Sequence, residues 1–335
     1  MALIKTDTSG LTVQRYSQLF RKMMLDHQIQ KLEVWKDAEK FELPQNAGTS
    51  TLRMFKRAAA DVTNVQTLTE GTAISTFNNT TVTNIDVALV QYADAARISD
   101  TRRLTDFLDQ AKLEVERMGE EAAIHLDSQI RDAIVNQVTD LPVQIYGQGL
   151  ASFNALRAAS VSAGAIVAKD LTRAATQLKI NRAPTFADGC YHAHLAPEQV
   201  YDLFNDDDWR EKSVRDSSDR IEKGYIGTYF GVKVYENTNP FKEQTAADRN
   251  EDAARVAWTS GVPVYNAIIL GKQAVGTVKL AGTSGPMDLQ FMIVNKPDSA
   301  NPLNQYTTIG WKAWYASKLL DSNWAVALRT KTTYA

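Results

Sequence analysis

Cysteine is nearly absent from this chain, whose 335 residues include only Cys190. A single thiol excludes an internal disulfide framework and any zinc cluster built on cysteine ligands. The neighbouring Tyr191 and His192 allow the hypothesis that Cys190 is a nucleophile. A free cysteine is more commonly a small buried apolar residue, so we predict that Cys190 packs in a short strand.

Long apolar runs and a strong imbalance of charge are also missing. No run approaches the roughly 20 residues that span a bilayer, and the first residues lack the basic and apolar parts of a signal peptide, so we expect no membrane association. The 37 basic residues nearly balance the 39 acidic ones, which argues against a general nucleic-acid binder that neutralises phosphates. The length and the 44% hydrophobic content predict a soluble protein with two domains, or one core with large excursions.

Motifs of common catalytic classes are absent as well. Gly224, Gly227 and Gly231 have the wrong spacing for a dinucleotide-binding turn, and neither Gly-Lys-Ser nor Gly-Lys-Thr occurs. Ser284 lies at the wrong offset from Gly282 for a nucleophile turn. We therefore predict that the chain is not an enzyme and that it has no catalytic residue and no cofactor.

Two histidines support the main alternative to that prediction. His192 and His194 are two positions apart in an expected strand, so both side chains face the same way and could be metal ligands. Asp206–Asp208 could complete such a site, although consecutive carboxylates point in different directions. A solvated loop that meets its equivalent on another subunit explains the acidic run better. We predict no metal and keep a metal-dependent hydrolase as the third functional hypothesis.

The first part of the chain predicts an arm and an excursion. Apolar residues recur at helical spacing from Leu11 to about Lys40, which predicts a helical arm that docks on the body or on a neighbouring subunit. Thr51–Arg57 follows as a predicted strand. Residues 61–83 are rich in Thr and Asn and have few large side chains, which predicts a two-stranded excursion that needs another surface to lie on. A mobile surface loop is the alternative.

A long helix is predicted next. Residues 84–98 form an expected strand, and the Ser-Asp pair that follows can cap a helix with apolar residues three and four positions apart. Over residues 101–137 this helix would be roughly 55 Å long, at about 1.5 Å per residue. A coiled coil is the less attractive alternative, because the flanking strands can cover one apolar stripe. His125 in this helix and His27 in the arm are expected to pack.

The middle of the chain alternates helices and strands. Residues 151–168 predict a linker with a short helix, and Asp170 can cap a helix over Leu171–Ile180. Pro197 predicts the first turn of another helix. Trp209 lies in a densely charged stretch. Strands are expected at 190–195, 232–236, 266–270 and 277–280.

The C-terminal part has the most regular pattern. Residues 309–319 alternate between two faces with a period of two, which predicts one long strand. Residues 320–323 can reverse the chain, and 324–328 would return antiparallel beside it. Trp311 and Tyr315 share the face that we expect to pack on the long helix. Trp314 lies on the opposite face and is a candidate subunit contact.

Short motifs spread from about residue 51 to 326 follow one another in a defined order. They are Leu68–Gly71, Gln91–Asp94, Ile98–Asp100, Pro197–Leu203, Tyr229–Val232, Asn301–Gln305 and Ile309–Lys312. In this order and at these separations they resemble the major capsid proteins of tailed bacteriophages, specifically the group typified by the coat protein of phage N-four.

The resemblance implies an α+β fold of the Hong Kong 97 type, the capsid fold of tailed phages. Its parts are an N-terminal arm, an extended β-hairpin loop, a peripheral domain with a long spine helix, and an axial domain. The implied ranges are 1–50 for the arm, 51–90 for the extended loop, 91–164 with 286–335 for the peripheral domain, 101–137 for its spine helix, and 165–285 for the axial domain.

The resemblance also implies a function and partners. Subunits of such proteins form pentamers and hexamers that close an icosahedral shell around double-stranded DNA without reading its sequence. The expected location is the virion, after assembly in the host cytoplasm. A portal and a separate scaffolding protein are implied partners, the latter because the chain begins almost directly with its arm. A decoration protein is a further candidate. Lys–Asn cross-linking, known in one branch of the fold, is not expected because no motif here supports it.

Two further expectations complete the hypothesis. The candidate subunit contacts are Trp35, Arg53, Lys56, Arg57, Glu70, Trp209 and Trp314. The second functional hypothesis is a bacterial nanocompartment shell protein, similar to encapsulins, which shares the fold but encloses cargo enzymes.

Overall fold

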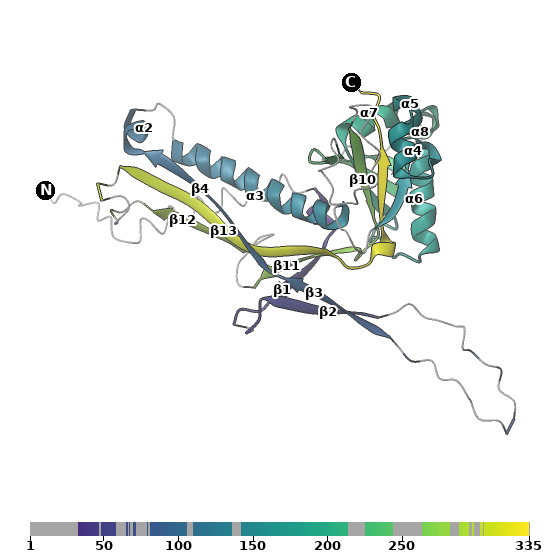
Figure 1. The fold of residues 1–335 in the computed structure, drawn as a ribbon, viewed down its shortest axis with the longest axis horizontal. Coiled ribbons are helices and arrows are strands. Elements are labelled where there is room, and N and C mark those ends of the chain that lie inside the picture. The colour runs from purple at the N-terminus through teal and green to yellow at the C-terminus, as the bar shows by residue number, and fades with distance from the viewer. Residues whose placement is uncertain are drawn as a thin grey trace.

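The structure is a computed structural model of the chain. It describes residues 33–46, 48–57, 65, 67, 70–71, 79, 81–105, 110–135, 142–213, 225–243, 263–281, 288–294, 297, 302–303 and 305–334. Most of the predicted arm and most of the excursion over 61–83 therefore lie outside the described residues. Figure 1 shows two sheets with their helices and a hairpin that projects away from them.

The first sheet is built around β13 (Tyr306–Leu319), the longest strand in the described part of the chain. Its other strands are β1 (Glu39–Leu43), β4 (Val90–Ser99), β11 (Val275–Leu280) and β12 (Asp288–Val294). β4 pairs antiparallel with residues 306–315 of β13, and β12 pairs antiparallel with residues 308–314 on the opposite side. β11 pairs with the last five residues of β13, and β1 runs parallel to β11. The predicted long strand is thus confirmed.

One face of this sheet is covered by the helix α3 (Gln110–Val135). Trp311 and Tyr315 point toward this helix and are 4% and 1% exposed. Both belong to one hydrophobic cluster with the helix residues Met118 and Leu126. The two-residue period of β13 therefore places these aromatic rings in the core, as predicted.

The predicted long helix is found in two described parts. α2 covers Asp100–Thr105 and α3 covers Gln110–Val135, while residues 106–109 and 136–141 lie outside the description. His125 packs in α3 as expected, because its ring lies against that of Tyr315 at a centroid distance of 6.0 Å. No helix within the described ranges is long and apolar enough to cross a bilayer.

The hairpin consists of β2 (Thr51–Arg57) and β3 (Val82–Ala88), which pair antiparallel over seven positions. Only Leu89 separates β3 from β4, so the hairpin continues one strand of the first sheet outward (Figure 1). The predicted strand over 51–57 is confirmed. The single strand expected over 84–98 is two strands with this short break between them.

The second sheet has β10 (Val264–Leu270) at its centre, where every residue is buried. Its other strands are β5 (Val143–Tyr146), β6 (Tyr191–Leu195), β7 (Tyr225–Tyr229), β8 (Val232–Glu236), β9 (Phe241–Glu243) and β14 (Ala325–Thr330). β14 pairs with β10 on one side, and β6 and β9 pair with different halves of β10 on the other. β5 lies beyond β14, and β8 and β7 lie beyond β6.

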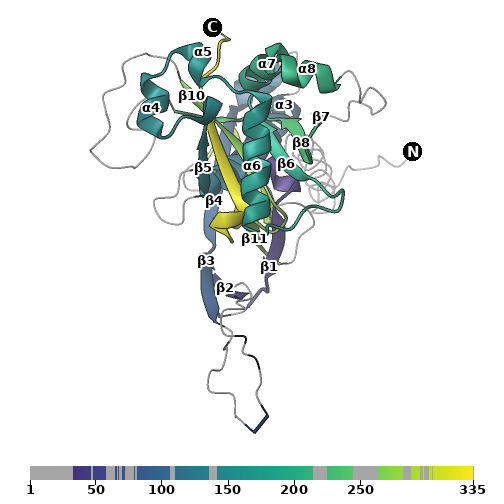
Figure 2. The same ribbon diagram turned by 90° about the vertical axis from the view of Figure 1, so that its right-hand side faces the viewer.

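Helices pack around the second sheet, with α6 along it in Figure 2. They are α4 (Phe153–Ala158), α5 (Val161–Gly164), α6 (Ala168–Ile180), α7 (Pro197–Asn205) and α8 (Asp207–Ser213). Ser152 and Ser160 cap α4 and α5 by accepting backbone N–H bonds. The expected linker thus contains two short helices. Asp170 lies inside the first turn of α6, where its carboxylate accepts from the backbone of Val167 at 3.3 Å.

Two predictions near the ends of the chain are wrong. The segment predicted to return along β13 is β14, which pairs instead with β10 and β5. All six residues of β14 are buried, so this strand needs cover on both faces, which the middle of a sheet provides. Within the described residues 33–40, the end of the predicted helical arm is instead a single 3-10 turn, η1 (Val34–Lys36), and the start of β1. Phe41 and Leu43 of β1 alternate with charged residues, and its backbone pairs with β11.

The two sheets combine distant parts of the chain. β1 comes from the range expected to be the arm, and β11 from the range 165–285, yet both belong to the first sheet. β5 and β14 come from the ranges 91–164 and 286–335, yet both belong to the second. The sheet in which a strand lies is therefore not given by its position along the chain.

Candidate functional site

The hairpin presents an exposed row of side chains along β2. Arg53, Phe55 and Arg57 alternate along this strand and all three are exposed, Phe55 by 71%. Arg53 donates to the carboxylate of Asp86 on β3 through Nε and Nη2, at 2.7 and 2.8 Å. Covering Phe55 would remove a large apolar surface from water. This row is therefore a candidate contact surface.

One face of the hairpin is fixed to the body along most of its described length. The Nζ atom of Lys56 lies 2.7 Å from Oδ2 of Asp321, a nearly buried residue that follows β13. Lys318 on β13 donates to the backbone oxygen of Asp86 at 3.2 Å. Met54 packs in a cluster with residues of β1, β3 and β11. The described hairpin is thus held by the first sheet and by the turn after β13, as far as Lys56 near the end of β2.

A groove of about 960 Å³ lies beside residues 54–57 of β2. It runs between β2, the end of α6 and the turn that follows β13. Its lining includes Phe41, Met54, Phe55, Arg57, Arg182 and Trp324. Lysine and arginine side chains and the carboxylates of Glu39 and Asp321 also line it, so the groove combines apolar side chains with charges of both signs.

The face of the first sheet away from α3 is exposed in the described part of the chain. Ala95 of β4 and Met292 and Val294 of β12 are exposed on it. Gly310 of β13 lies between Ala95 and Met292 in the register. A Cβ atom on Gly310 would meet the backbone oxygen of Asp94 at 3.1 Å, so the strands approach closely here because this residue is glycine. The result is an exposed sheet face with closely spaced strands around Gly310.

The predicted contact residues on the hairpin and beside α3 lie in different surroundings. Arg57 and Glu70 are exposed, and Glu70 lies in a turn with Gly71. Trp35 is half-buried, and the Nζ atom of Lys40 lies 3.7 Å from the centroid of its ring. The indole of Trp35 is therefore already partly covered by its own chain.

The other two tryptophans also lie in different surroundings. Trp314 is half-buried and packs in the cluster at the base of the hairpin. Trp209 is 2% exposed, and its ring stacks on that of Tyr229 at a centroid distance of 5.6 Å. Trp209 therefore belongs to the core of the second sheet and offers no surface to another subunit, which corrects the sequence-based expectation.

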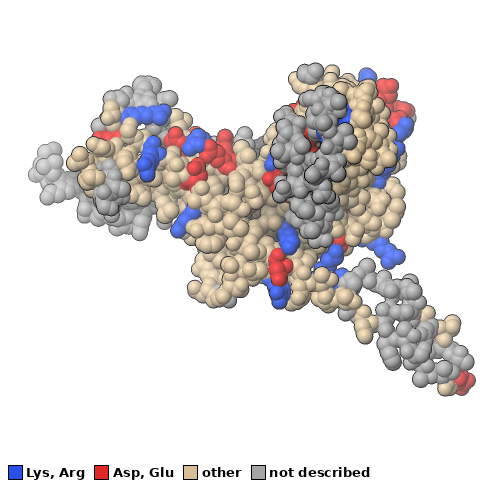
Figure 3. Space-filling view, viewed as in Figure 1, with Lys and Arg blue, Asp and Glu red and all other residues tan. Residues whose placement is uncertain are grey.

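The solvent side of α3 is acidic. Figure 3 shows Asp and Glu side chains gathered over this part of the molecule, while basic side chains lie near the base of the hairpin. In α3, Arg117 pairs with Glu114 at 2.8 Å and also with Glu121. These residues and Glu116 and Glu120 leave the helix with an excess of negative charge. The hairpin and the helix thus present opposite charges.

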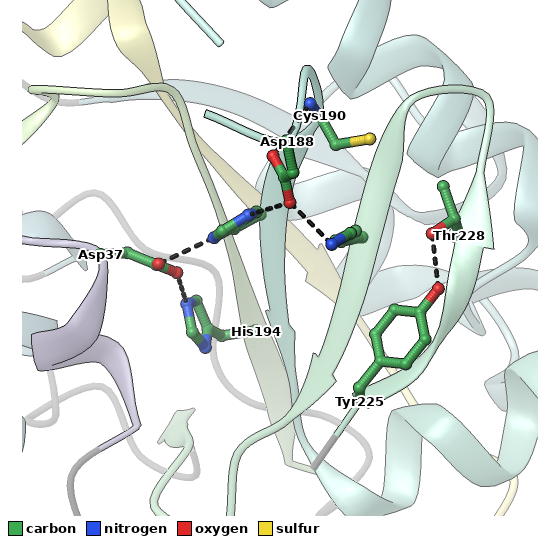
Figure 4. A network of polar contacts seen from close by, with 8 residues as sticks. Asp37, Asp188, Cys190, His194, Tyr225 and Thr228 are labelled. Atoms are coloured by element: carbon green, nitrogen blue, oxygen red, sulfur yellow. Dashed lines mark hydrogen bonds and ion pairs between the residues drawn. The ribbon is translucent and has the colours of Figure 1, made fainter. Parts of the chain in front are cut away.

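Side chains from distant parts of the chain meet at Asp37, which follows η1 (Figure 4). Its carboxylate accepts from His192 Nδ1 and from His194 Nε2 of β6, both at 2.7 Å. His192 Nε2 lies 3.0 Å from Oδ2 of Asp188, and Lys233 of β8 lies 2.8 Å from the same oxygen. We name these five residues the His–Asp junction.

The geometry of the junction determines the charge of His192. Both of its ring nitrogens face carboxylate oxygens, which only accept hydrogen bonds, so both nitrogens donate and the ring is an imidazolium. Burial by itself would lower the pKa of His192, but the bonds and charges of Asp37 and Asp188 raise it above its ordinary value. Burial by itself would raise the pKa of both carboxyls. The contacts with Lys233 and His192 instead lower the pKa of Asp188 to about 2. The bonds with His192 and His194 lower the pKa of Asp37 well below its usual range.

The segment before the junction is fixed by two more carboxylates. Oδ1 of Asp127 in α3 accepts from the backbone N–H groups of Val34 and Trp35, at 3.0 and 3.1 Å. Glu33 accepts from the backbone and the hydroxyl of Thr238, at 2.9 and 3.0 Å. Burial raises the pKa of both carboxyls. Residues 33–38 are therefore bonded to the long helix and to the second sheet.

The residues of the metal hypothesis have other partners. His192 and His194 do face the same way, as their spacing predicts, but Asp37 binds both. The carboxylate of Asp206 accepts from the backbone of Ala168 at 2.6 Å, and Asp208 lies 3.4 Å from Lys169. Within the described ranges no group of three or more His, Cys, Asp or Glu side chains is arranged to hold a metal ion.

Cys190 lies at the edge of the junction. It is half-buried, and its backbone N–H donates to Asp188 at 3.1 Å. Burial raises the pKa of its thiol, which disfavours the thiolate that a nucleophile needs. The structure thus favours a packing role for this residue.

Sequence reasoning missed Asp37, Asp127 and Asp188. Asp37 is 155 positions from His192, and no local spacing links the two. The two-residue period of β6 was the one usable signal, since it predicts that His192 and His194 share a face and can share a partner. The identity of that partner depends on how β1 and β6 are placed in three dimensions.

Comparison with known proteins gives similarity in structure only. No protein-family model and no curated protein sequence matches the chain. The capsid of Ralstonia phage GP4 is similar at a TM-score of 0.65 and 14% identity, over 90% of this chain and 92% of that one. The capsid of cyanophage P-SCSP1u is similar at a TM-score of 0.58 and 20% identity, over 89% and 88%. A virus-like particle from Pyrococcus furiosus is similar at a TM-score of 0.53 and 9% identity, over 93% and 99%.

These similarities confirm the predicted fold class. The chain has an α+β fold that matches phage capsid structures along about nine tenths of its length. At such low identities the comparison establishes the fold, whereas function has to be argued from surfaces and contacts.

Proposed function

We propose that this chain is the major capsid protein of a tailed phage. Copies of it would form pentamers and hexamers that close an icosahedral shell around the double-stranded DNA genome. The observation that supports this most is the likeness to the Ralstonia phage GP4 capsid, which covers 90% of this chain and 92% of that one. The match extends over nearly the full length of both chains, and the role that we propose is mechanical.

The exposed surfaces give this proposal its interfaces. The row Arg53, Phe55 and Arg57 and the face around Gly310 would lie against other copies, the first as a projecting element and the second as a flat receiving surface. The positive hairpin and the acidic side of α3 would favour the encounter through complementary charge. Of the predicted contacts, Arg53, Lys56, Arg57, Glu70, Trp35 and Trp314 remain candidates.

The finer assignments belong to the same proposal. The fold would be of the Hong Kong 97 type and the group that of phage N-four, with the arm at 1–50 and the extended loop at 51–90. A scaffolding protein, a portal and a decoration protein are the proposed partners. Assembly would take place in the host cytoplasm, and the location of the product would be the virion.

Electron microscopy of the expressed full chain, alone and with its scaffolding protein, tests the proposal. We expect rings, sheets or closed shells, because the surfaces described above repeat on every copy. A population that stays strictly monomeric with scaffolding protein present would overturn it.

Boiled and reduced particles should run as one band on a denaturing gel, since no cross-link is proposed, and a ladder of bands would contradict this.

A nanocompartment shell is the second candidate function. The likeness to the virus-like particle from Pyrococcus furiosus, which covers 99% of that chain, favours it specifically. Both functions predict shells, so the content of the particles separates them. Nuclease-protected DNA inside particles purified from the native source would support the phage capsid, while a single enclosed protein would support the nanocompartment.

A further inference from the structure

We propose that His192 is a pH-dependent link between the two sheets. As an imidazolium it joins Asp37, two residues before β1 of the first sheet, to Asp188, which precedes β6 of the second. Loss of one proton removes one of these two contacts and loosens the junction. This inference stands on the geometry of the single chain and does not depend on the proposed function.

The hydrogen bonds require the charged ring. A neutral imidazole has one N–H group, so its other nitrogen would turn a lone pair toward a carboxylate oxygen at 2.7 or 3.0 Å. His194 differs, because it gives Asp37 one bond through Nε2, while its Nδ1 has no hydrogen-bond partner among the described residues. A neutral His194 therefore satisfies Asp37 as well as a charged one. The proton that matters is on His192.

The ring of His192 cannot turn to avoid the conflict. Phe186 stacks on one of its faces at a centroid distance of 4.0 Å, and Tyr235 of β8 meets it at 5.1 Å. In the folded chain one of the two carboxylates therefore has to move away from the nitrogen that has lost its proton. Asp188 is held by Lys233 and by the backbone of Cys190, so the movement reaches the segments on both sides of the ring.

The surrounding charges set the direction of the effect. The groups that face the junction are Asp37 and Lys40 from the N-terminal segment, Asp188 and Cys190 from the turn before β6, His194 from β6, and Lys233 and Tyr235 from β8. The carboxyls of Glu33 and Asp127 lie further away, on the side of His194. When His192 is neutral, the carboxylates of Asp37 and Asp188 both remain charged, and Lys233 contacts that of Asp188. The junction should therefore be tight in mild acid and looser in base.

The sign follows from proton linkage. The folded chain raises the pKa of His192 above its ordinary value of about 6.5. The stabilisation that this residue provides is complete below about pH 6.5 and is lost as the pH rises through the folded value. The carboxyls of Asp37 and Asp188 have the opposite pH dependence. Because folding lowers their pKa values, the stabilisation that they provide is complete above about pH 4 and is lost in stronger acid. The tight state should thus lie between about pH 4 and about pH 6.5.

Titration of the imidazoles by NMR tests the charge directly. The chain has four histidines, so His192 can be assigned from the resonance lost in His192→Gln. We expect His192 to titrate above 6.5, because Asp37 and Asp188 raise its pKa, and we expect Asp188→Asn to move this titration down. His125 serves as the control, since it lies away from the junction and should titrate alike in both proteins. A His192 that titrates at or below 6.5 in the wild-type chain would overturn the proposal.

Cys190 offers a second, independent measurement. It is the only cysteine, and its backbone is bonded to Asp188, so its thiol reports on the loosened turn. We expect its labelling rate, corrected for the thiolate fraction, to rise about fivefold or more between pH 6 and pH 9 in the wild-type chain. In His192→Gln the corrected rate should be independent of pH, and in His125→Gln it should rise as in the wild type. If His192→Gln does not fold, Asp37→Asn takes its place with the same expectation. A corrected rate with equal pH dependence in variant and wild type would refute the link.

Discussion

The carboxylate of Asp127 lies 3.0 Å from the backbone nitrogen of Val34, a residue 93 positions earlier in the chain. η1 is a single 3-10 turn, and the N–H groups at the start of such a turn have no partner within it. Asp127, from the middle of α3, accepts two of them. This contact fixes the point at which the N-terminal segment leaves the body, and it determines where truncation and mutation should act.

Replacing Asp127 tests this contact. In Asp127→Ala the N–H groups of Val34 and Trp35 lose a buried acceptor, which should lower the free energy of unfolding by about 2 kcal/mol. Asp127→Asn keeps an acceptor oxygen of similar size, and its loss should be below about 1 kcal/mol. Urea unfolding at pH 7 measures both. Equal losses in the two variants would mean that packing, and not the hydrogen bonds, explains the role of Asp127.

Two truncations should separate the arm from the body. Deleting residues 1–32 removes none of the described contacts of Asp127 or Asp37, so we expect a chain with wild-type unfolding temperature but impaired shell formation. Deleting residues 1–38 also removes Val34, Asp37 and their bonds, and should lower the unfolding temperature clearly. Thermal unfolding and electron microscopy check the pair. Wild-type shell yield from the shorter deletion would count against the arm as a contact between subunits.

The exposed ring of Phe55 should matter for assembly and not for folding. Because its side chain is largely in water, Phe55→Ser should change the free energy of unfolding by less than about 0.5 kcal/mol. We expect it to abolish or strongly reduce shells, since the hairpin loses its main apolar contact. Phe55→Tyr is the matched control and should still assemble. Normal shells from the serine variant would exclude Phe55 from the interface.

Gly310 should tolerate no side chain. Its Cβ atom would lie 3.1 Å from the backbone oxygen of Asp94 and 3.2 Å from Cβ of Ala95, so Gly310→Val has to displace β4. We expect a loss of about 1 to 3 kcal/mol in the free energy of unfolding. The control is Ala93→Val on exposed β4, where a branched residue suits a strand and the change should stay within about 0.5 kcal/mol. Denaturant unfolding of both variants is the measurement.

Acid should remove the contribution of Asp188. Lys233 and His192 lower the pKa of this carboxyl to about 2, despite burial, from an ordinary value of about 4. A lowered carboxyl pKa stabilises the fold fully above about pH 4, and this stabilisation is lost as the pH falls toward about 2. Asp188→Asn should therefore be less stable than the wild type at pH 5 to 6, with the gap closing toward pH 2.5. Urea unfolding across this range measures the gap, and a gap that stays constant with pH would show that Asp188 acts without its charge.

Local patterns predicted most elements because each pattern has a direct physical cause. The alternation in β13 follows from one buried face, and the strands β2 and β8 were predicted over their observed ranges. Pro197 begins α7 because a proline at the first helical position loses no hydrogen bond. The resemblance to capsid proteins, also a matter of short local motifs, predicted the fold class that the structural similarities confirm.

Those local patterns do not predict which strand pairs with which. Residues 324–328 have the composition of a strand, but nothing local decides between β13 and β10 as the neighbour. The burial of all six residues of β14 decides it, and burial is a property of the assembled sheets. In the same way Trp209 is set in a highly charged stretch, which suggests exposure, although its ring packs in a core formed by distant strands.

The sequence by itself determined many of the helices and strands, which faces of the long strand and helix meet, and which fold class they form, because periodicity and turn chemistry act over a few residues. Only the tertiary structure decided that Asp37 binds both histidines, that Asp127 holds the backbone of Val34, and that β14 belongs to the second sheet. These contacts join residues 55 to 157 positions apart. Each depends on the burial and desolvation of charged or apolar groups, which arise only when the two sheets are packed together.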